Sequence, residues 1–224
     1  MLCLPEFRLK KICDTLLQFI ITDYNRCIEE GNENLSYIYL LFHEDEEVEK
    51  TSGIYKQAIQ VLVKNQIDSS ENNRKIEVRP IFDRSRAGLP TIHITCPQDS
   101  DDLKQIGDED GDEKFYQERL APRLSRGFLA QFGIIITSDN IMEVLILNYT
   151  LRSLLLGSIA DLSDLGFINP TFQTQELNIR PNILPANVYM KGLLMTSNYV
   201  DSFPDVETYK GFKNIIFILD KIKY

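Results

Sequence analysis

The chain has 224 residues, of which 43% are hydrophobic and 25% charged, so we expect a soluble globular protein with enough apolar residues to bury a sizeable core. Its formal charge of -9 is concentrated in two acidic runs, residues 44–50 and 99–114, and the remainder is almost neutral. This charge distribution argues against a protein that coats nucleic acid through a basic excess. The apolar runs are too short for a membrane span, and we expect neither a secretion signal nor a membrane partner.

The first half of the chain predicts helices followed by two strands. Apolar residues at three- and four-residue spacing predict an amphipathic helix over residues 6–30, with Gly31 as its C-cap. Residues 35–42 are a short apolar run, residues 53–64 fit either a helix or a strand, and residues 64–75 are polar and predict a loop. Proline-bounded strands follow at 75–82 and 89–96, and the second predicts a half-exposed His93.

The second half predicts a strand, a buried helix and further strands. The strand spans residues 126–138, with Gly127 and Gly133 as candidate bulges. A helix over 140–156 begins with a capping-box-like Asn140 and Glu143 and has Gly157 as its C-cap. It is apolar on most of its circumference, so we expect deep burial, with Leu145, Leu151 and Leu155 packed on the sheet. Residues 159–170 predict a loop, and strands are expected at 172–179, 187–200 and 212–220.

These elements predict an α+β fold with a mostly antiparallel sheet. An N-terminal helix and the central buried helix flank the sheet, and a long acidic loop spans residues 98–116. No internal repeat or linker divides the chain, so one domain over residues 1–224 is expected, with segment 44–75 as a variable insertion. The four cysteines contain no CxxC pair, and Cys13 and Cys27 would lie ~21 Å apart on one helix, which predicts reduced thiols.

The acidic loop contains IGDEDGDEK (106–114), which superficially resembles an EF-hand calcium loop. If Gly111 occupies loop position 6, Asp108 and Asp110 fall correctly at positions 3 and 5. Positions 1 and 12 are then Ile106 and Gln117, so the first ligand and the bidentate glutamate are both absent. We therefore expect a charged loop without bound calcium.

Signatures of catalysis are absent from the sequence. The chain has no GxSxG, P-loop, HExxH or strand-linked GxGxxG motif. His93 and Cys96 would face opposite sides of a straight strand, and His43 beside Glu44 and Asp45 fits a solvated cluster better than a metal site. We predict no enzyme activity, no cofactor and no metal.

A basic stretch follows the acidic loop. Arg119, Arg123 and Arg126 alternate with apolar residues, and such adjacent acidic and basic blocks can pair between copies of one chain. The alternative is that both blocks are ordinary solvated faces. The interface expected from the first interpretation comprises Asp108, Glu109, Asp110, Asp112, Glu113, Arg119, Arg123 and Arg126.

The order of elements resembles the tail-terminator and neck proteins of tailed bacteriophages. The resemblance covers residues 6–200 and includes the strand LPTIHIT, the charged loop, the strand GFLAQFGIIITS, the helix NIMEVLILNYTLRSLLLGS and the strand pair FQTQELNI and NVYMKGLLMTSNYV. The chain departs from this family in segment 44–75 and in the predicted strand 212–220.

This resemblance implies a structural virion protein that forms a ring of six or twelve copies and joins head to tail around the DNA channel. Implied partners are the portal or other neck proteins, the tail tube protein, and DNA that passes without sequence-specific binding. The implied location is the virion, with assembly in the host cytoplasm. Two alternatives remain from the sequence: a small cytosolic enzyme with a dispersed active site, and a module that binds one partner protein.

Overall fold

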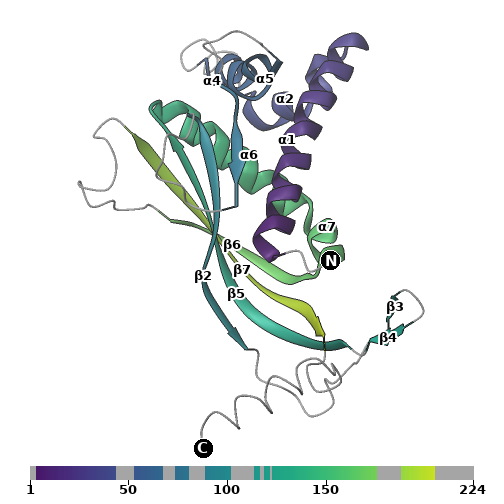
Figure 1. Cartoon of the computed structure of the whole chain (residues 1–224). Helices are drawn as coiled ribbons and strands as arrows, with labels where there is room; N and C mark the ends of the chain where they lie inside the picture. Colours follow the sequence, from purple (N-terminus) through teal and green to yellow (C-terminus); the bar gives the residue numbers. More distant parts are fainter. Residues whose placement is uncertain are drawn as a thin grey trace, which may run out of the picture.

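The computed structural model describes residues 4–43, 53–67, 74–80, 89–101, 114–116, 119–121, 123–175 and 188–204. Within them the chain forms a five-stranded, mostly antiparallel sheet, a set of helices and a separate two-stranded sheet (Figure 1). The predicted α+β class is therefore confirmed. The predicted strand 212–220 lies outside the described residues.

The N-terminal part of the chain is helical. The long first helix ends as predicted, because Gly31 adopts a left-handed φ of 72° directly after the helix. The segment at 53–64, which fitted a helix or a strand, is helical and contains a π-helical turn, and the helix continues to Ile67 into the predicted loop. The elements are α1 (Pro5–Glu29), the short turn η1 (Glu33–Leu35), α2 (Tyr37–Phe42), α4 (Ile54–Ile59), η2 (Gln60–Lys64) and α5 (Asn65–Ile67).

The main sheet has the strand order β1-β2-β5-β7-β6, and only the β1–β2 pair is parallel. Strands β5 and β7 are both 16 residues long and pair without interruption over their whole length. The strands are β1 (Glu77–Arg79), β2 (Thr91–Asp101), β5 (Arg123–Ser138), β6 (Phe167–Gln175) and β7 (Tyr189–Pro204), while β3 (Lys114–Tyr116) and β4 (Arg119–Ala121) pair separately. Both ends of the predicted loop 98–116 are therefore strands, because β2 continues to Asp101 and β3 begins at Lys114.

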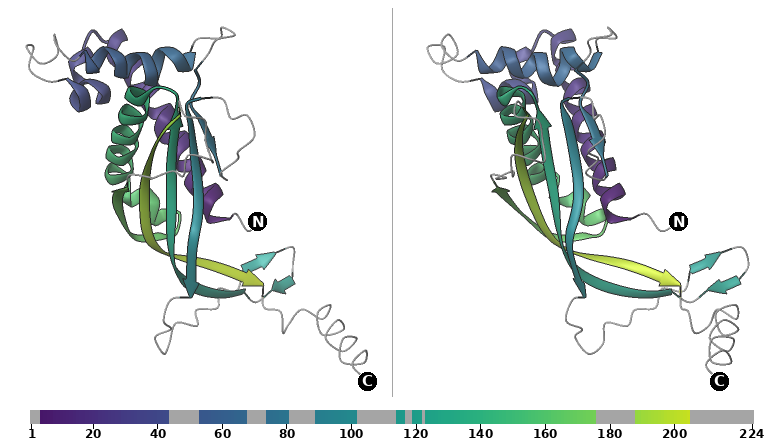
Figure 2. Two further views of the ribbon diagram at one scale, coloured as in Figure 1. Left: turned by 90° about the vertical axis from the view of Figure 1, so that its left-hand side faces the viewer. Right: turned by 60° about the vertical axis from the view of Figure 1, so that its left-hand side comes forward.

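Helices α1 and α6 (Ile141–Gly157) pack on one face of the main sheet (Figure 2). Alternating residues of the strands point into this layer, where Ile94, Phe132 and Leu193 are completely buried. Leu9 of α1 and Leu151 and Leu155 of α6 are also fully buried, as expected for α6. The amphipathic spacing of α1 and the apolar character of α6 thus produce one continuous core.

Leu145 departs from the prediction, because its side chain is 40% exposed. The residues of α6 that face the core are set by its orientation on β5 and β7, and Leu145 falls on the opposite side. A helix that is apolar almost all round does not encode locally which stripe faces the sheet. The prediction of burial was correct for Leu151 and Leu155 and wrong for Leu145.

His93 was predicted to be half-exposed and is 2% exposed. Arg79 of β1 and Ile135 of β5 stand on either side of it in register, so neighbouring strands cover both flanks of the side chain. The alternation of residues along β2 could not reveal this, because burial of its second face depends on elements distant in the sequence.

Residues 159–170, predicted as a loop, form α7 (Ile159–Asp164) and the start of β6. The predicted bulges in β5 are also wrong. The register of β5 with β7 is continuous at Gly127 and Gly133, and the irregularity lies in β2, between Thr95 and Gln98. Gly133 is required opposite this irregularity, since a Cβ there would lie 2.9 Å from the Thr95 hydroxyl oxygen.

Among the described residues, no helix has the length and apolarity that crossing a membrane requires. Cys13, Cys27 and Cys96 are reduced thiols, as the spacing argument predicted. Burial raises the pKa of the Cys13 thiol to about 12, so this buried thiol stays protonated and unreactive at neutral pH.

Candidate functional site

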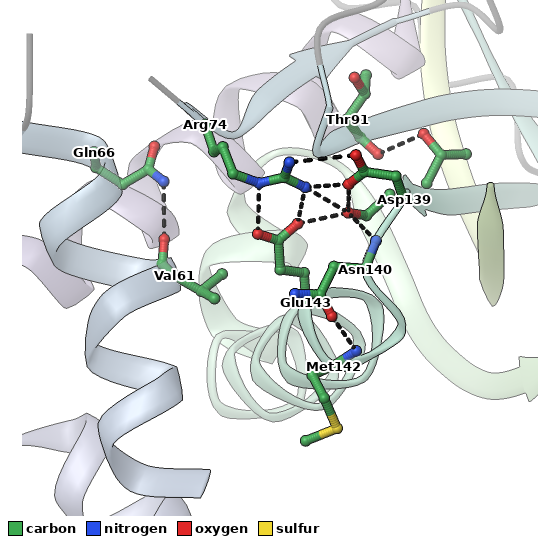
Figure 3. A network of polar contacts seen from close by, with 10 residues as sticks. Val61, Gln66, Arg74, Thr91, Asp139, Asn140, Met142 and Glu143 are labelled. Carbon is green, nitrogen blue, oxygen red and sulfur yellow. Dashed lines mark hydrogen bonds and ion pairs between the residues drawn. The ribbon is translucent and has the colours of Figure 1, made fainter. Parts of the chain in front are cut away.

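The most connected polar cluster of the described chain surrounds Arg74, just before β1 (Figure 3). Its guanidinium binds the Glu143 carboxylate through two bonds, Nε to Oε1 at 2.8 Å and Nη2 to Oε2 at 2.7 Å. The same group donates to Asp139, and Nη2 also lies 3.2 Å from the hydroxyl oxygen of Ser138. One arginine therefore joins the segment before β1 to the turn between β5 and α6. We call Arg74, Ser138, Asp139 and Glu143 the Arg74 cluster.

Local structure at the start of α6 places the three acceptors. Ser138 ends β5, and its hydroxyl donates to Glu143 Oε2 at 2.5 Å and accepts from the backbone amide of Asn140 at 3.1 Å. Asn140 is the N-cap, as predicted, and its side chain accepts from the Met142 amide at 2.9 Å. Glu143 does not complete the expected capping box, because its carboxylate is taken by Arg74 and Ser138 instead.

Hydrogen bonding favours the charged forms of Arg74 and Asp139. Hydrogen bonding from Arg74 lowers the pKa of Asp139, and hydrogen bonding to Glu143 and Asp139 raises the pKa of the Arg74 guanidinium. Glu143 has a side chain only 5% exposed, and it lies in the first turn of α6, where the helix dipole favours a negative charge. The Glu143 side chain is therefore buried and has Arg74 as its ion-pair partner.

Arg74, Asp139 and Glu143 of the cluster line an open pocket with a volume of about 710 Å³. The same pocket is lined by the amide side chains of Gln57 in α4, Gln60 in η2 and Asn65 in α5. Gln60 donates to Asn65 at 2.6 Å, so these two amides are held in place by each other. Ile141 and Tyr189, each about half exposed, supply apolar surface at the same pocket.

The side-chain amide of Gln66 links the segment that carries Arg74 to the preceding helices. Gln66 donates to the Val61 carbonyl at 2.9 Å (Figure 3). It also accepts from the Ile76 amide at 2.9 Å. Val61 lies in the π-helical turn, where the widened backbone pattern makes a carbonyl available to a side chain. The residues on both sides of segment 68–73 are therefore tied to the helices.

The polar side chains of the Arg74 cluster are mainly engaged with one another. Arg74 is bonded to both Asp139 and Glu143, and the hydroxyl of Ser138 donates to the Glu143 side chain. The hydroxyl-carboxylate contact of Ser138 and Glu143 is of the kind that exchanges a proton, but Glu143 is also bound by Arg74. In the described part of the chain, no group of three or more His, Cys, Asp or Glu side chains is arranged to hold a metal ion.

A separate aromatic cluster contains His43. Its ring stacks on Tyr39 with centroids 4.1 Å apart and meets the edge of Tyr55 at 5.9 Å. Tyr55 in turn donates to Glu33 at 2.6 Å, and burial followed by this bond raises the pKa of the Tyr55 phenol. His43 is thus an aromatic packing residue, while Glu44 and Asp45, its alternative metal-ligand neighbours, lie outside the described residues.

The interface predicted from sequence is only partly described. Asp108, Glu109, Asp110, Asp112 and Glu113 lie outside the described residues. For the three arginines the backbone alone is described: Arg119 is in β4 opposite Tyr116, and Arg123 and Arg126 are in β5 opposite Pro204 and Asp201. The two arginine positions in β5 therefore share one strand that extends away from the helices.

That strand belongs to a two-stranded extension of the sheet, which we call the projecting ribbon (residues 123–127 of β5 and 200–204 of β7). Within the described chain, β2 pairs with β5 only from Phe128 onward, and β6 pairs with β7 only up to Tyr199. The ribbon extends beyond the part of the sheet that α1 and α6 cover, and in Figure 1 it bends below the helices. Figure 2 shows the same extension from two other sides.

Sequence reasoning missed the Arg74 cluster, although each component was visible. Arg74 lies in the predicted polar loop 64–75, and Asn140 with Glu143 marked the start of a helix, but Arg74 and Glu143 are 69 residues apart. A glutamate in the first turn of an otherwise apolar helix was the available signal that a cation must approach it. No protein-family model matches the chain, and no curated protein matches its sequence significantly.

Proposed function

We propose that this chain is a structural protein of a tailed-bacteriophage virion. It forms a homo-oligomeric ring in the neck or at the head-proximal end of the tail, and joins head to tail around the DNA channel. The portal or another neck protein and the tail tube protein are its partners, and it assembles in the host cytoplasm. The proposal starts from the order of elements that resembles the tail-terminator and neck proteins.

The projecting ribbon is the observation that carries the proposal. Its five residue pairs, Arg123–Pro204 to Gly127–Val200, extend roughly 17 Å at the usual rise per strand residue. A two-stranded ribbon with no third strand is marginal in water and gains stability when another surface packs on it. A ring subunit uses such an arm to reach its neighbour, and head-to-tail repetition of that contact closes a ring.

The charge pattern around the ribbon supports the same interpretation. Arg119, Arg123 and Arg126 follow the acidic residues 108–113 in the chain, and the arginine positions lie in β4 and in the ribbon strand itself. Opposite charges on two copies favour one register of association and disfavour others. Acidic groups that line a channel also let DNA pass without adhering, because like charges repel phosphates.

The polar pocket favours a structural role over the enzyme alternative. Its ionised groups are mutually satisfied, and the amide side chains and half-exposed Ile141 and Tyr189 suit contact with another protein surface. Such a surface is also compatible with a module that binds a single partner protein, which would remain monomeric by itself. Oligomeric state therefore separates the two remaining classes.

The direct test is native mass spectrometry with negative-stain imaging of the purified chain, alone and with its neighbouring neck proteins. We expect closed rings of six or twelve copies. A strictly monomeric chain at high concentration that is not incorporated into particles would contradict the proposal.

A matched pair of variants tests the acidic loop within this assembly. Replacement of Asp108, Glu109, Asp110, Asp112 and Glu113 by Asn or Ser should weaken ring formation or head–tail joining while circular dichroism stays unchanged, since exposed charges contribute little to folding. The control removes the same charge from the other acidic run, at Glu44, Asp45, Glu46, Glu47 and Glu49. Added salt should weaken the native contact, and calcium should have no effect on it. Equal loss of assembly in both variants would show that net charge, rather than this loop, is responsible.

A further inference from the structure

Helix α6 has an apolar outer face. Its exposed side chains are those of Ile141, Leu145, Tyr149, Arg152 and Leu156, which follow one another at intervals of four, four, three and four residues. The apolar members are 40–53% exposed. A helix on the surface of a protein normally turns polar residues outward, whereas this spacing is that of a seam between two helices. We call these five residues the α6 stripe.

The middle of the α6 stripe is held in position. Tyr149 packs against Phe42 of α2 with ring centroids 5.8 Å apart, and the same helix is bonded to α6 through the Tyr37 and Ser153 hydroxyls at 2.8 Å. Arg152, the only charged residue of the stripe, makes no hydrogen bond or ion pair with the described residues. The stripe therefore presents a fixed aromatic ring beside a cation that has no acidic partner there.

We propose that the α6 stripe is a two-fold interface with the α6 stripe of a second copy of this chain, the two helices running antiparallel. An isologous contact needs a patch that is complementary to itself after reversal. Reversal of this stripe places Leu145 opposite Leu156 and Tyr149 opposite Arg152. Each leucine pair buries apolar surface, and each guanidinium lies over a tyrosine ring of the other copy, an arrangement that attracts cations. No carboxylate on the stripe opposes the pairing.

The area available sets the strength of this contact. If the four apolar side chains lose their exposed fractions and Ile159 of α7, also 45% exposed, joins them, both copies together bury on the order of 1,000 Å². Specific interfaces generally begin at about 1,200 Å², so the dimer is weak and dissociates on dilution. This contact uses a surface other than the projecting ribbon, so variants of the α6 stripe test it separately from the head-to-tail contact of the proposed ring.

Cysteine pairing tests the geometry directly. Leu145→Cys and Leu156→Cys chains, mixed and oxidised, should form a covalent heterodimer, since the two positions face each other. Each variant oxidised alone should form no more covalent dimer than the native chain does. The same position in the two copies is separated by 11 residues, or ~16 Å along antiparallel helices, which is far beyond the reach of a disulfide. The native cysteines set the background level of covalent dimer, and Cys13 and Cys27 add little to it because they are buried.

Sedimentation velocity on the full chain provides the second measurement. Leu145→Asp should raise the dimer dissociation constant by about tenfold or more without changing the circular dichroism spectrum, as for a central apolar contact. Ile28→Asp makes the same change at a similarly exposed residue of α1, which is 45% exposed, and should leave the dimer intact.

A monomer at all concentrations, or a dimer that Leu145→Asp does not weaken, would overturn the two-fold interface. Rings with neck proteins but no cross-link between the Leu145→Cys and Leu156→Cys chains would likewise overturn it while leaving the proposed function standing. A cross-linked dimer in a chain that never forms rings would support the interface and contradict the ring.

Discussion

Removal of the Arg74 side chain should destabilise the whole fold rather than one loop. Arg74→Met keeps most of the aliphatic length but leaves the Glu143 carboxylate, 5% exposed, without its cation. Asp139 loses the same partner, but its side chain is 40% exposed and water can replace the bond. The expected cost therefore comes mainly from Glu143, for which the Ser138 hydroxyl is the one remaining partner among the described residues.

The magnitude follows from the burial of the pair. Loss of one partner from a fully buried ion pair costs about 3–5 kcal/mol, and an exposed pair contributes ~1 kcal/mol or less. The Arg74 side chain is 36% exposed, so we place Arg74→Met between these limits, at about 2 kcal/mol of unfolding free energy. For a chain of this size that is a decrease of about 4–8 °C in the melting temperature.

The double variant Arg74→Met with Glu143→Leu is the informative comparison. It removes the buried charge together with its partner, and should be more stable than Arg74→Met alone, because replacement of both members of a buried pair is often nearly neutral. Urea unfolding followed by circular dichroism measures all three proteins, and this probe suits a chain without tryptophan. A loss below ~0.5 kcal/mol in Arg74→Met, or a double variant no more stable than the single one, would refute the reasoning.

Three further outcomes are expected from named contacts. Leu151→Ala, at a fully buried position of α6, should lower the unfolding free energy by ~2–5 kcal/mol in urea titration, and a loss below about 1 kcal/mol would contradict its place in the core. Gly133→Ala should lower the unfolding free energy by ~1–3 kcal/mol, because the new methyl group meets the Thr95 hydroxyl oxygen at 2.9 Å. Gly157→Ala is its control: the space around this position is open, so the unfolding free energy should stay the same or rise by up to ~1 kcal/mol in the same assay. Because the pKa of Asp139 is lowered in the native state, the stability that its ionised side chain contributes is present above the ordinary carboxyl pKa of about 3.9 and is lost as pH falls through the lowered value. Asp139→Asn should therefore be less stable than the native chain at pH 7 and equally stable in acid. A difference in stability that persists at low pH would argue against this ion pair.

The sequence alone determined the elements whose signals are local. The spacing of apolar residues along α1, the left-handed Gly31 after it and the Asn140 cap of α6 are properties of a few neighbouring residues, and the structure confirmed each of them. Strands β2, β5 and β7 were located in the same way, from β-branched and apolar runs bounded by proline or glycine. The α+β class followed from these elements.

Only the tertiary structure decided which surfaces of those elements are buried. The uniform apolar character of α6 is equally compatible with any orientation, and packing on β5 and β7 placed Leu151 inside and Leu145 outside. His93 became buried because Arg79 and Ile135 flank it from other strands. Arg74 reached Glu143 across 69 residues for the same reason. Periodicity reports the relation of a residue to its own helix or strand, whereas burial and ion pairing depend on which distant segments pack against it, and that is determined by the free energy of the whole chain.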